Sequence, residues 1–143
     1  MLLETILRKS ESLDRCLARI REEYDGRDKT FPTDYRRQDS IVLNLQRACE
    51  QCIDVAQVLL KYSNLKRPRK NAELFQVLAD NQVIMPDTAA RLRAMVGFRN
   101  IAVHEYQALS LEVLETIITT HLSDLRSFID HALEVVASEN DKG

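Results

Sequence analysis

The sequence of 143 residues has little of the material from which turns are made, with three glycines and three prolines. A sheet protein needs many tight turns, and these two residue types are among those that form them most readily. Leucine, alanine, arginine, glutamate and aspartate are plentiful instead, as in proteins built from long helices. The composition favours an all-α fold, and the length suits one domain with one core.

Cysteine is also scarce, with three residues, Cys16, Cys49 and Cys52. An odd number within helical patterns argues against a disulfide framework and indicates a reducing compartment, so we expect a cytoplasmic protein. Cys49 and Cys52 have the C-x-x-C spacing of some metal and redox sites. No second Cys or His pair follows at the distance of a zinc site, however, and we expect no metal and no cofactor.

Long apolar runs and an excess of positive charge are missing as well. No stretch approaches the length that spans a membrane, and the first helix acquires charges early, so we expect neither membrane association nor a signal peptide. The formal net charge is -2, and binding to a polyanion would therefore need a local basic patch. The densest patch is KRPRK at residues 66–70, although such clusters are more often solvated surface.

What the sequence does contain is an apolar pattern with three- and four-residue intervals, typical of amphipathic helices. It predicts five helices, over residues 2–24, 34–62, 72–80, 86–101 and 111–136. The second has the broadest apolar face, and we expect it to form the spine of the core. We expect one domain over residues 1–137 and a disordered tail over 138–143.

The segment RNIAVHEY at residues 99–106 concentrates the side chains that can carry out chemistry. At about 100° per residue, Asn100 and His104 should share one helix face, and Arg99 and Tyr106 another. A long Arg99 side chain could still reach toward His104, so that both could meet at one phosphate. Arginine supplies a permanent charge, and histidine can move a proton near neutral pH. These are the groups that a metal-independent ribonuclease needs.

Structural roles for the same residues remain open at this point. A lone histidine in a helix is usually a surface or hydrogen-bonded residue, and Arg99 could simply pair with Glu105 or Asp87. His121 and His131 have no arginine at matching spacing, and we expect both to be structural.

The order Arg99, four residues, His104, one residue, Tyr106 resembles the signature of HEPN-domain ribonuclease toxins of the HepT-like branch. Residues 48–56, ACEQCIDVA on the second predicted helix, resemble the second characteristic block of that branch. The resemblance extends from the first helix to Val136. One departure is visible, because the family often has a histidine after that block where this chain reads QVL at 57–59.

The resemblance implies a HEPN-type antiparallel bundle of about five helices that forms a homodimer, with one composite cleft between the Arg-x4-His segments. It implies a metal-independent endoribonuclease that cleaves transfer or messenger RNA through attack of the ribose 2′-hydroxyl. His104 would act as general base or acid, and Arg99 would bind and stabilise the phosphate. Asn100 would orient His104 or contact phosphate, and Glu105 is a weaker candidate for substrate binding.

The resemblance also implies a type VII toxin–antitoxin module with a cognate MNT-type nucleotidyltransferase as antitoxin. That partner would transfer AMP to Tyr106, and the added charge would repel RNA. Two alternatives remain open from the sequence. One is a non-catalytic helical adaptor, and the other is a substrate-binding partner of a nucleotidyltransferase, which would need a deep pocket.

Overall fold

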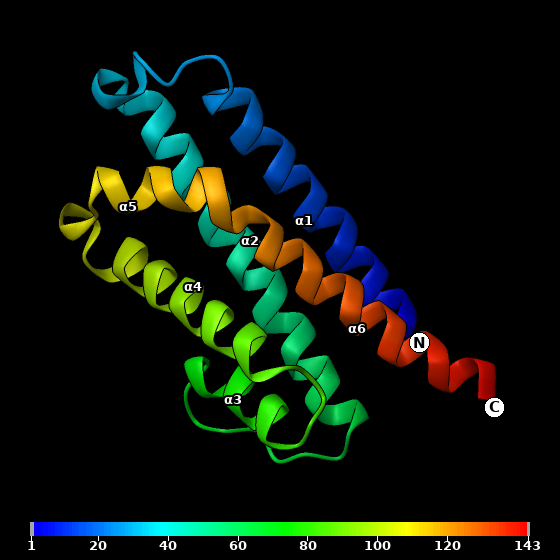
Figure 1. Cartoon of the computed structure of the whole chain (residues 1–143). Helices are drawn as coiled ribbons and strands as arrows, with labels where there is room; N and C mark the ends of the chain where they lie inside the picture. The colour runs from blue at the N-terminus through cyan, green and yellow to red at the C-terminus, as the bar shows by residue number, and fades with distance from the viewer. Residues whose placement is uncertain (1, 143) are drawn as a thin grey trace.

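The chain folds into antiparallel helices in the computed structural model, which describes residues 2–142, with the side chains of 139–142 excepted (Figure 1). The α-helices are α1 (Leu2–Tyr24), α2 (Tyr35–Tyr62), α3 (Ala72–Asp80), α4 (Pro86–His104), α5 (Leu111–Thr116) and α6 (Leu122–Lys142). Between them lie the 3-10 helices η1 (Phe31–Thr33) and η2 (Tyr106–Ala108) and the π-helical segment η3 (Ile117–His121). No strand occurs among the described residues, and the predicted all-α class is confirmed.

Local sequence explains where these helices begin and end. The Asp34 carboxylate accepts a hydrogen bond of 3.2 Å from the backbone N–H of Arg37 and caps the start of α2. Asn64, at φ 56, ends the same helix in the left-handed conformation, and the N–H of Leu65 returns to the carbonyl of Leu60 at 2.9 Å. Pro86 occupies the first turn of α4, where its missing N–H costs no helical bond.

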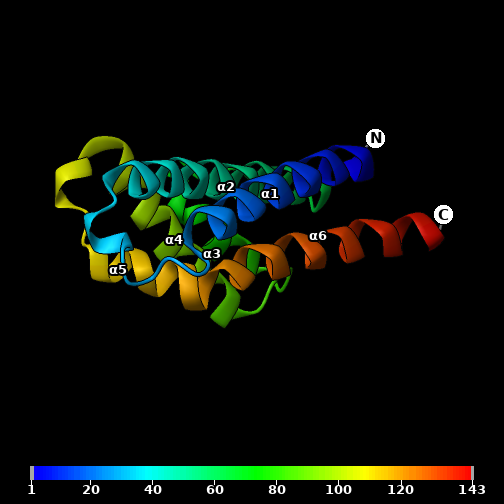
Figure 2. The ribbon, with the colours of Figure 1, turned by 90° about the horizontal axis from the view of Figure 1, so that it is seen from above.

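Helix α2 is the spine of the bundle, as its broad apolar face predicts. Twelve of its 28 residues are buried, and it contacts α1, α3, α4 and α6. Figure 2 shows α1 and α2 side by side, with α5 and α6 on the opposite side of the molecule. Both ends of the chain lie at the same end of the bundle, away from α5.

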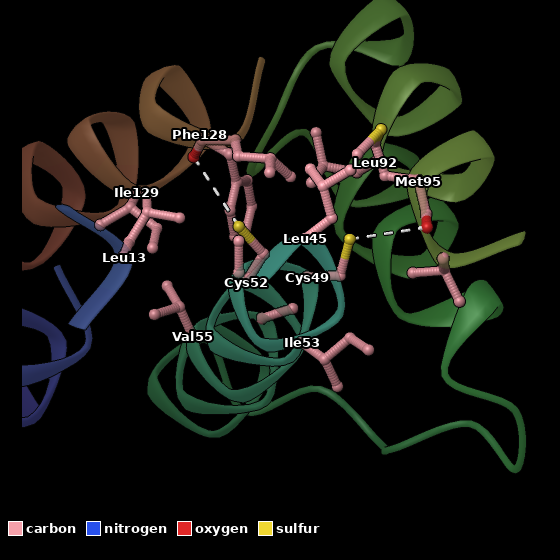
Figure 3. Packing of buried hydrophobic residues seen from close by; sticks show 14 of the residues in the cluster. Leu13, Leu45, Cys49, Cys52, Ile53, Val55, Leu92, Met95, Phe128 and Ile129 are labelled. Atoms are coloured by element: carbon pink, nitrogen blue, oxygen red, sulfur yellow. Dashed lines mark hydrogen bonds between the residues drawn. The ribbon is translucent and has the colours of Figure 1, made fainter. Parts of the chain in front are cut away.

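The C-x-x-C pair lies in the core, and its two thiols point toward different helices (Figure 3). Cys49 donates to the carbonyl of Met95 on α4 at 3.6 Å, and Cys52 donates to the carbonyl of Leu125 on α6 at 3.7 Å. Burial raises the pKa of Cys49 to about 12 and raises that of Cys52 as well. These cysteines therefore serve as small core residues that hold α2 against its neighbours.

One expectation about the last helix needs correction. The predicted single helix is interrupted at Ile117–His121, where the chain makes wider π turns between α5 and α6. Helix α6 itself continues to Lys142, into the region for which the sequence predicts a tail. Gly143 lies outside the described residues. Over the searched part of the chain, no helix combines the length and apolar character required to cross a membrane.

We expect Phe128→Ala to lower the free energy of unfolding by about 3–5 kcal/mol, because truncating a buried aromatic ring leaves a cavity. Phe128 is fully buried and meets Phe75 edge to face, with 5.3 Å between ring centroids. Denaturant titration followed by circular dichroism measures the loss. The control is Tyr35→Ala, at a side chain that is 70% exposed, where we expect a change below about 0.5 kcal/mol. Equal losses in the two variants would contradict this account of the core.

Candidate functional site

The last turns of α4 carry three of the predicted site residues. Phe98 and Ala102 are buried and fix this end of the helix against the core, while Asn100 and His104 are exposed. The predicted common face of Asn100 and His104 is confirmed, because α4 includes both residues and they lie four positions from each other. The N–H of Glu105 still bonds the carbonyl of Ile101 at 2.8 Å, but its own backbone leaves the helix at φ -140 and ψ 52.

Arg99 lies on the side of α4 that faces α2. Its Nη2 pairs with Glu50 Oε1 at 3.4 Å, and its Nη1 donates to Asn100 Oδ1 at 3.1 Å. The side chain is 23% exposed, and its Nε is buried without a hydrogen-bond partner in the described part of the chain. The guanidinium is thus oriented by a carboxylate while one of its donors remains unused. Its partner is Glu50, so the simple pairings with Glu105 or Asp87 are not the ones that form.

His104 is open to solvent. Among residues 2–142 its ring makes no hydrogen bond and no ion pair. Arg99 and His104 are five residues apart, which separates them by about 140° around α4. The chain therefore joins Arg99 to Asn100 and leaves His104 exposed on a different face of α4.

Tyr106 does not share a helix face with Arg99, and this part of the prediction is wrong. Helix α4 ends at His104, and Tyr106 begins η2. Its hydroxyl donates instead to the carboxylate of Asp39 on α2. Because Asp39 and Glu50 are separated by eleven residues of one helix, they lie about 16 Å apart along its axis. Tyr106 and Arg99 are therefore held at different levels of α2.

The environment of Tyr106 keeps its hydroxyl protonated. Partial burial, together with the hydrogen bond to Asp39 and the charge of that carboxylate, raises the pKa of Tyr106 to about 12. The side chain is nevertheless 46% exposed, so another molecule can reach it. It also lines a small pocket of about 290 Å³ with Gln38, Gln107 and Ser110.

A larger, mostly apolar groove of about 850 Å³ runs between α4 and the α5–η3 segment. Its α4 wall includes Ala90, Ala94, Gly97 and Ile101, at intervals of three or four residues, together with Arg91, Met95 and Phe98. An added side-chain carbon at Gly97 would meet no atom within 4 Å. The groove lies beside the exposed face of α4 that carries Asn100 and His104, since Gly97 is three residues before Asn100 and Ile101 is three residues before His104 on the helix surface.

The other two histidines have partners outside this site. His121 Nδ1 lies 3.0 Å from Asp124, and Arg91 Nη1 lies 3.7 Å from the same carboxylate at one end of the groove. His131 Nε2 lies 2.9 Å from the carbonyl of Val83. Their predicted structural roles agree with these contacts.

The basic segment at residues 66–70 forms the predicted loop between α2 and α3. It lies at the end of α2 opposite to Asp39 and is distant from the end of α4 that carries the motif (Figure 1). The groups that could bind a metal are also dispersed, since no cluster of three or more His, Cys, Asp or Glu occurs over the described residues.

The sequence did not identify Glu50 and Asp39 as residues of the site. Both belong to α2 and contact the site residues across 49 and 67 positions of sequence. Glu50 lies inside the block at 48–56 that carries the family resemblance, and this position could have identified it as a site residue. No pattern in the sequence distinguishes Asp39 from the other exposed carboxylates.

Comparisons with known proteins identify relatives over most of the chain. A family model described as ribonuclease HepT-like matches residues 13–132. The mRNA nuclease HepT of Shewanella oneidensis is 40% identical over 127 residues, which cover 89% of this chain and 95% of that protein.

Solved structures give the same result. A chain in a crystal structure of a toxin–antitoxin complex with AMP-PNP is 39% identical, with a TM-score of 0.85 over 90% of this chain and 96% of that one. The tri-AMPylated HEPN toxin of Shewanella oneidensis, in complex with an MNT antitoxin, is also 39% identical. Its TM-score is 0.84, over 89% of this chain and 95% of that one.

Removing the charge of Asp39 should lower the pKa of Tyr106, because the hydrogen bond and the charge both favour the protonated phenol. We expect Asp39→Asn protein, mixed rapidly to a pH one unit above the ordinary tyrosine value, to give more immediate phenolate absorbance than wild type. In a Tyr106→Phe background the same substitution should add nothing. Identical phenolate signals from wild type and Asp39→Asn would show that Asp39 does not hold this proton.

Proposed function

The chain belongs to the HepT-like ribonuclease family, and we propose that it is the toxin of a toxin–antitoxin pair, an endoribonuclease that cleaves messenger RNA. The observation that carries the proposal is the pairing of Arg99 with Glu50, which holds a cation beside Asn100 at the exposed end of α4. The nuclease relative of Shewanella oneidensis supports messenger RNA as the substrate.

The chemistry follows from the residue types. His104, free of other partners, takes the proton of a ribose 2′-hydroxyl as that oxygen attacks the adjacent phosphorus. The bond from phosphorus to the 5′-oxygen breaks, and a protonated histidine supplies the proton for this leaving group. Arg99 stabilises the negative charge that develops on the phosphate, and Asn100 contributes a polar contact beside it. The products are a 2′,3′-cyclic phosphate and a 5′-hydroxyl, and no step of this mechanism uses a metal ion.

We further propose that the active form is a homodimer in which a second copy of the chain packs along the groove between α4 and α5. The groove is mostly apolar, its α4 wall includes the small residues Ala90, Ala94 and Gly97, and Ile101 and Val113, which also line it, are 40% and 50% exposed. Small residues allow two helices to approach closely, and an exposed apolar surface of this kind is typical of an interface. A partner in this groove would bring its own Asn100 and His104 next to those of the first subunit, forming a composite cleft.

The antitoxin in this proposal is an MNT-type nucleotidyltransferase that transfers AMP to Tyr106 in the cytoplasm. The tri-AMPylated toxin structure supports this partner, and the three free cysteines support a reducing compartment. Because the Tyr106 hydroxyl is held at Asp39, the added phosphate would lie beside that end of α2, two residues after His104 in the chain. Its negative charge would repel the RNA backbone at the edge of the cleft.

We expect His104→Ala and Arg99→Ala each to lower the rate of RNA cleavage at least about 10²-fold, because each removes a group that acts on the reacting phosphate. The assay uses total cellular RNA with EDTA present, and cyclic phosphate ends are measured. His131→Ala is the matched control, since His131 contacts only a backbone carbonyl, and it should retain activity. Cleavage by His104→Ala at the wild-type rate would remove His104 from the mechanism. An inactive wild type without AMP on Tyr106 would favour a non-catalytic adaptor.

We expect Gly97→Glu to convert the dimer into a monomer with little ribonuclease activity. The subunit itself should tolerate this change, because nothing lies within 4 Å of the new side-chain carbon and glutamate is a better helix former than glycine. Light scattering during size-exclusion chromatography measures the mass. Ser127→Glu adds the same charge at an exposed position of α6 outside the groove and should stay dimeric. A dimeric, active Gly97→Glu protein would place the interface elsewhere.

A further inference from the structure

We propose that Asp39 is the general base for nucleotidylation of Tyr106, so that this protein supplies part of the catalytic machinery for its own modification. The inference rests on the proposed transfer of AMP to Tyr106 and concerns a residue that lies on another helix. Its basis is the hydrogen bond from the Tyr106 hydroxyl to the Asp39 carboxylate.

Transfer of AMP to Tyr106 requires a group that accepts the proton of its hydroxyl. A tyrosine hydroxyl that attacks a phosphorus atom must lose its proton, and a protonated phenol is a weak nucleophile. The surroundings of Tyr106 make spontaneous ionisation harder, because they raise its pKa to about 12. An acceptor already in contact with the hydroxyl removes this obstacle, since the proton can move as the new bond forms.

The contact with Asp39 also distinguishes Tyr106 from the more exposed Tyr35. Tyr35 is the more accessible side chain, at 70% exposed against 46% for Tyr106. Within the described chain, however, no carboxylate accepts a hydrogen bond from the Tyr35 hydroxyl. Exposure alone would therefore select Tyr35, whereas a ready proton acceptor selects Tyr106.

Both Asp39 and Tyr106 are accessible from solvent. Asp39 is exposed on the outer surface of α2, so its carboxylate can return a proton to solvent after each transfer. Tyr106 borders the small pocket with Gln38 and Gln107, and an incoming phosphate can approach the hydroxyl from this open side. The base and the approaching group thus need not compete for one position.

The proposed reaction transfers AMP from ATP to the Tyr106 hydroxyl. A lone pair of the Tyr106 hydroxyl oxygen attacks the α-phosphorus of ATP, and the bond from that phosphorus to the bridging oxygen breaks. Pyrophosphate leaves with the bonding electrons, and the hydroxyl proton passes to Asp39 and then to water. The product is a tyrosine–AMP phosphodiester, which can no longer donate to Asp39 and which carries a negative charge close to that carboxylate.

The test measures AMP incorporation by intact-protein mass spectrometry, with purified full-length protein, its cognate nucleotidyltransferase, ATP and magnesium. We expect Asp39→Asn to lower kcat at least about 10²-fold with KM for the toxin unchanged, because asparagine keeps a hydrogen-bond acceptor but takes up no proton. Asp39→Glu, which restores a carboxylate, should recover part of the rate. A rise in KM with kcat unchanged would show that Asp39 serves docking instead and would overturn the proposal.

Two controls separate this inference from the function on which it rests. Asp80→Asn removes an equally exposed carboxylate from α3 and should be modified at the wild-type rate, while Tyr106→Phe should receive no AMP. Modification of Asp39→Asn at the wild-type rate would mean that the nucleotidyltransferase provides the base, and the proposed function would stand without this inference. A wild-type protein that receives no AMP at all would overturn both.

Discussion

The burial of α2 is the constraint on which the rest of this structure depends. Its apolar face is fixed by contacts with four other helices, so the helix can neither rotate nor slide without opening the core. Its outer face consequently presents Asp39 and Glu50 in fixed directions. The motif itself lies at the end of another helix, yet both of its functional ends, the guanidinium of Arg99 and the hydroxyl of Tyr106, are oriented by carboxylates of α2.

Much of the fold could be predicted from the sequence, because its information is local. The ends of α1, α2 and α3 follow from apolar periodicity and from the positions of Gly26, Asp34 and Pro68. The π turns at Ile117–His121 were missed, since apolar residues continue through them at intervals that an α-helix also allows. The position of Tyr106 outside α4 was missed for a similar reason, because no glycine or proline comes soon after His104 to mark the end of the helix.

For the candidate site too, the sequence predicts the local features and not those that depend on distant residues. Arg99, Asn100 and His104 lie within six residues and belong to a recognisable pattern, so the sequence was sufficient to identify them as candidates. Their orientation was not predictable, because it depends on contacts with α2 that span many residues of chain. The result differs from the helical-wheel expectation in one important respect: Tyr106 and Arg99 occupy separate electrostatic environments, one beside each carboxylate. A change at one of them can therefore leave the local structure of the other intact.

The π-helical segment has a consequence for how this chain can vary in length. Wider turns accommodate an extra residue, so the faces of α5 and α6 are offset from the register that one continuous α-helix would impose. Deleting one residue there would close the wide turns into ordinary α-helical turns and change the orientation of α5 relative to α6. Val113 and Thr116 would then turn relative to the groove that they now line. Functional variants of this protein should therefore tolerate substitutions within Ile117–His121 more readily than insertions or deletions.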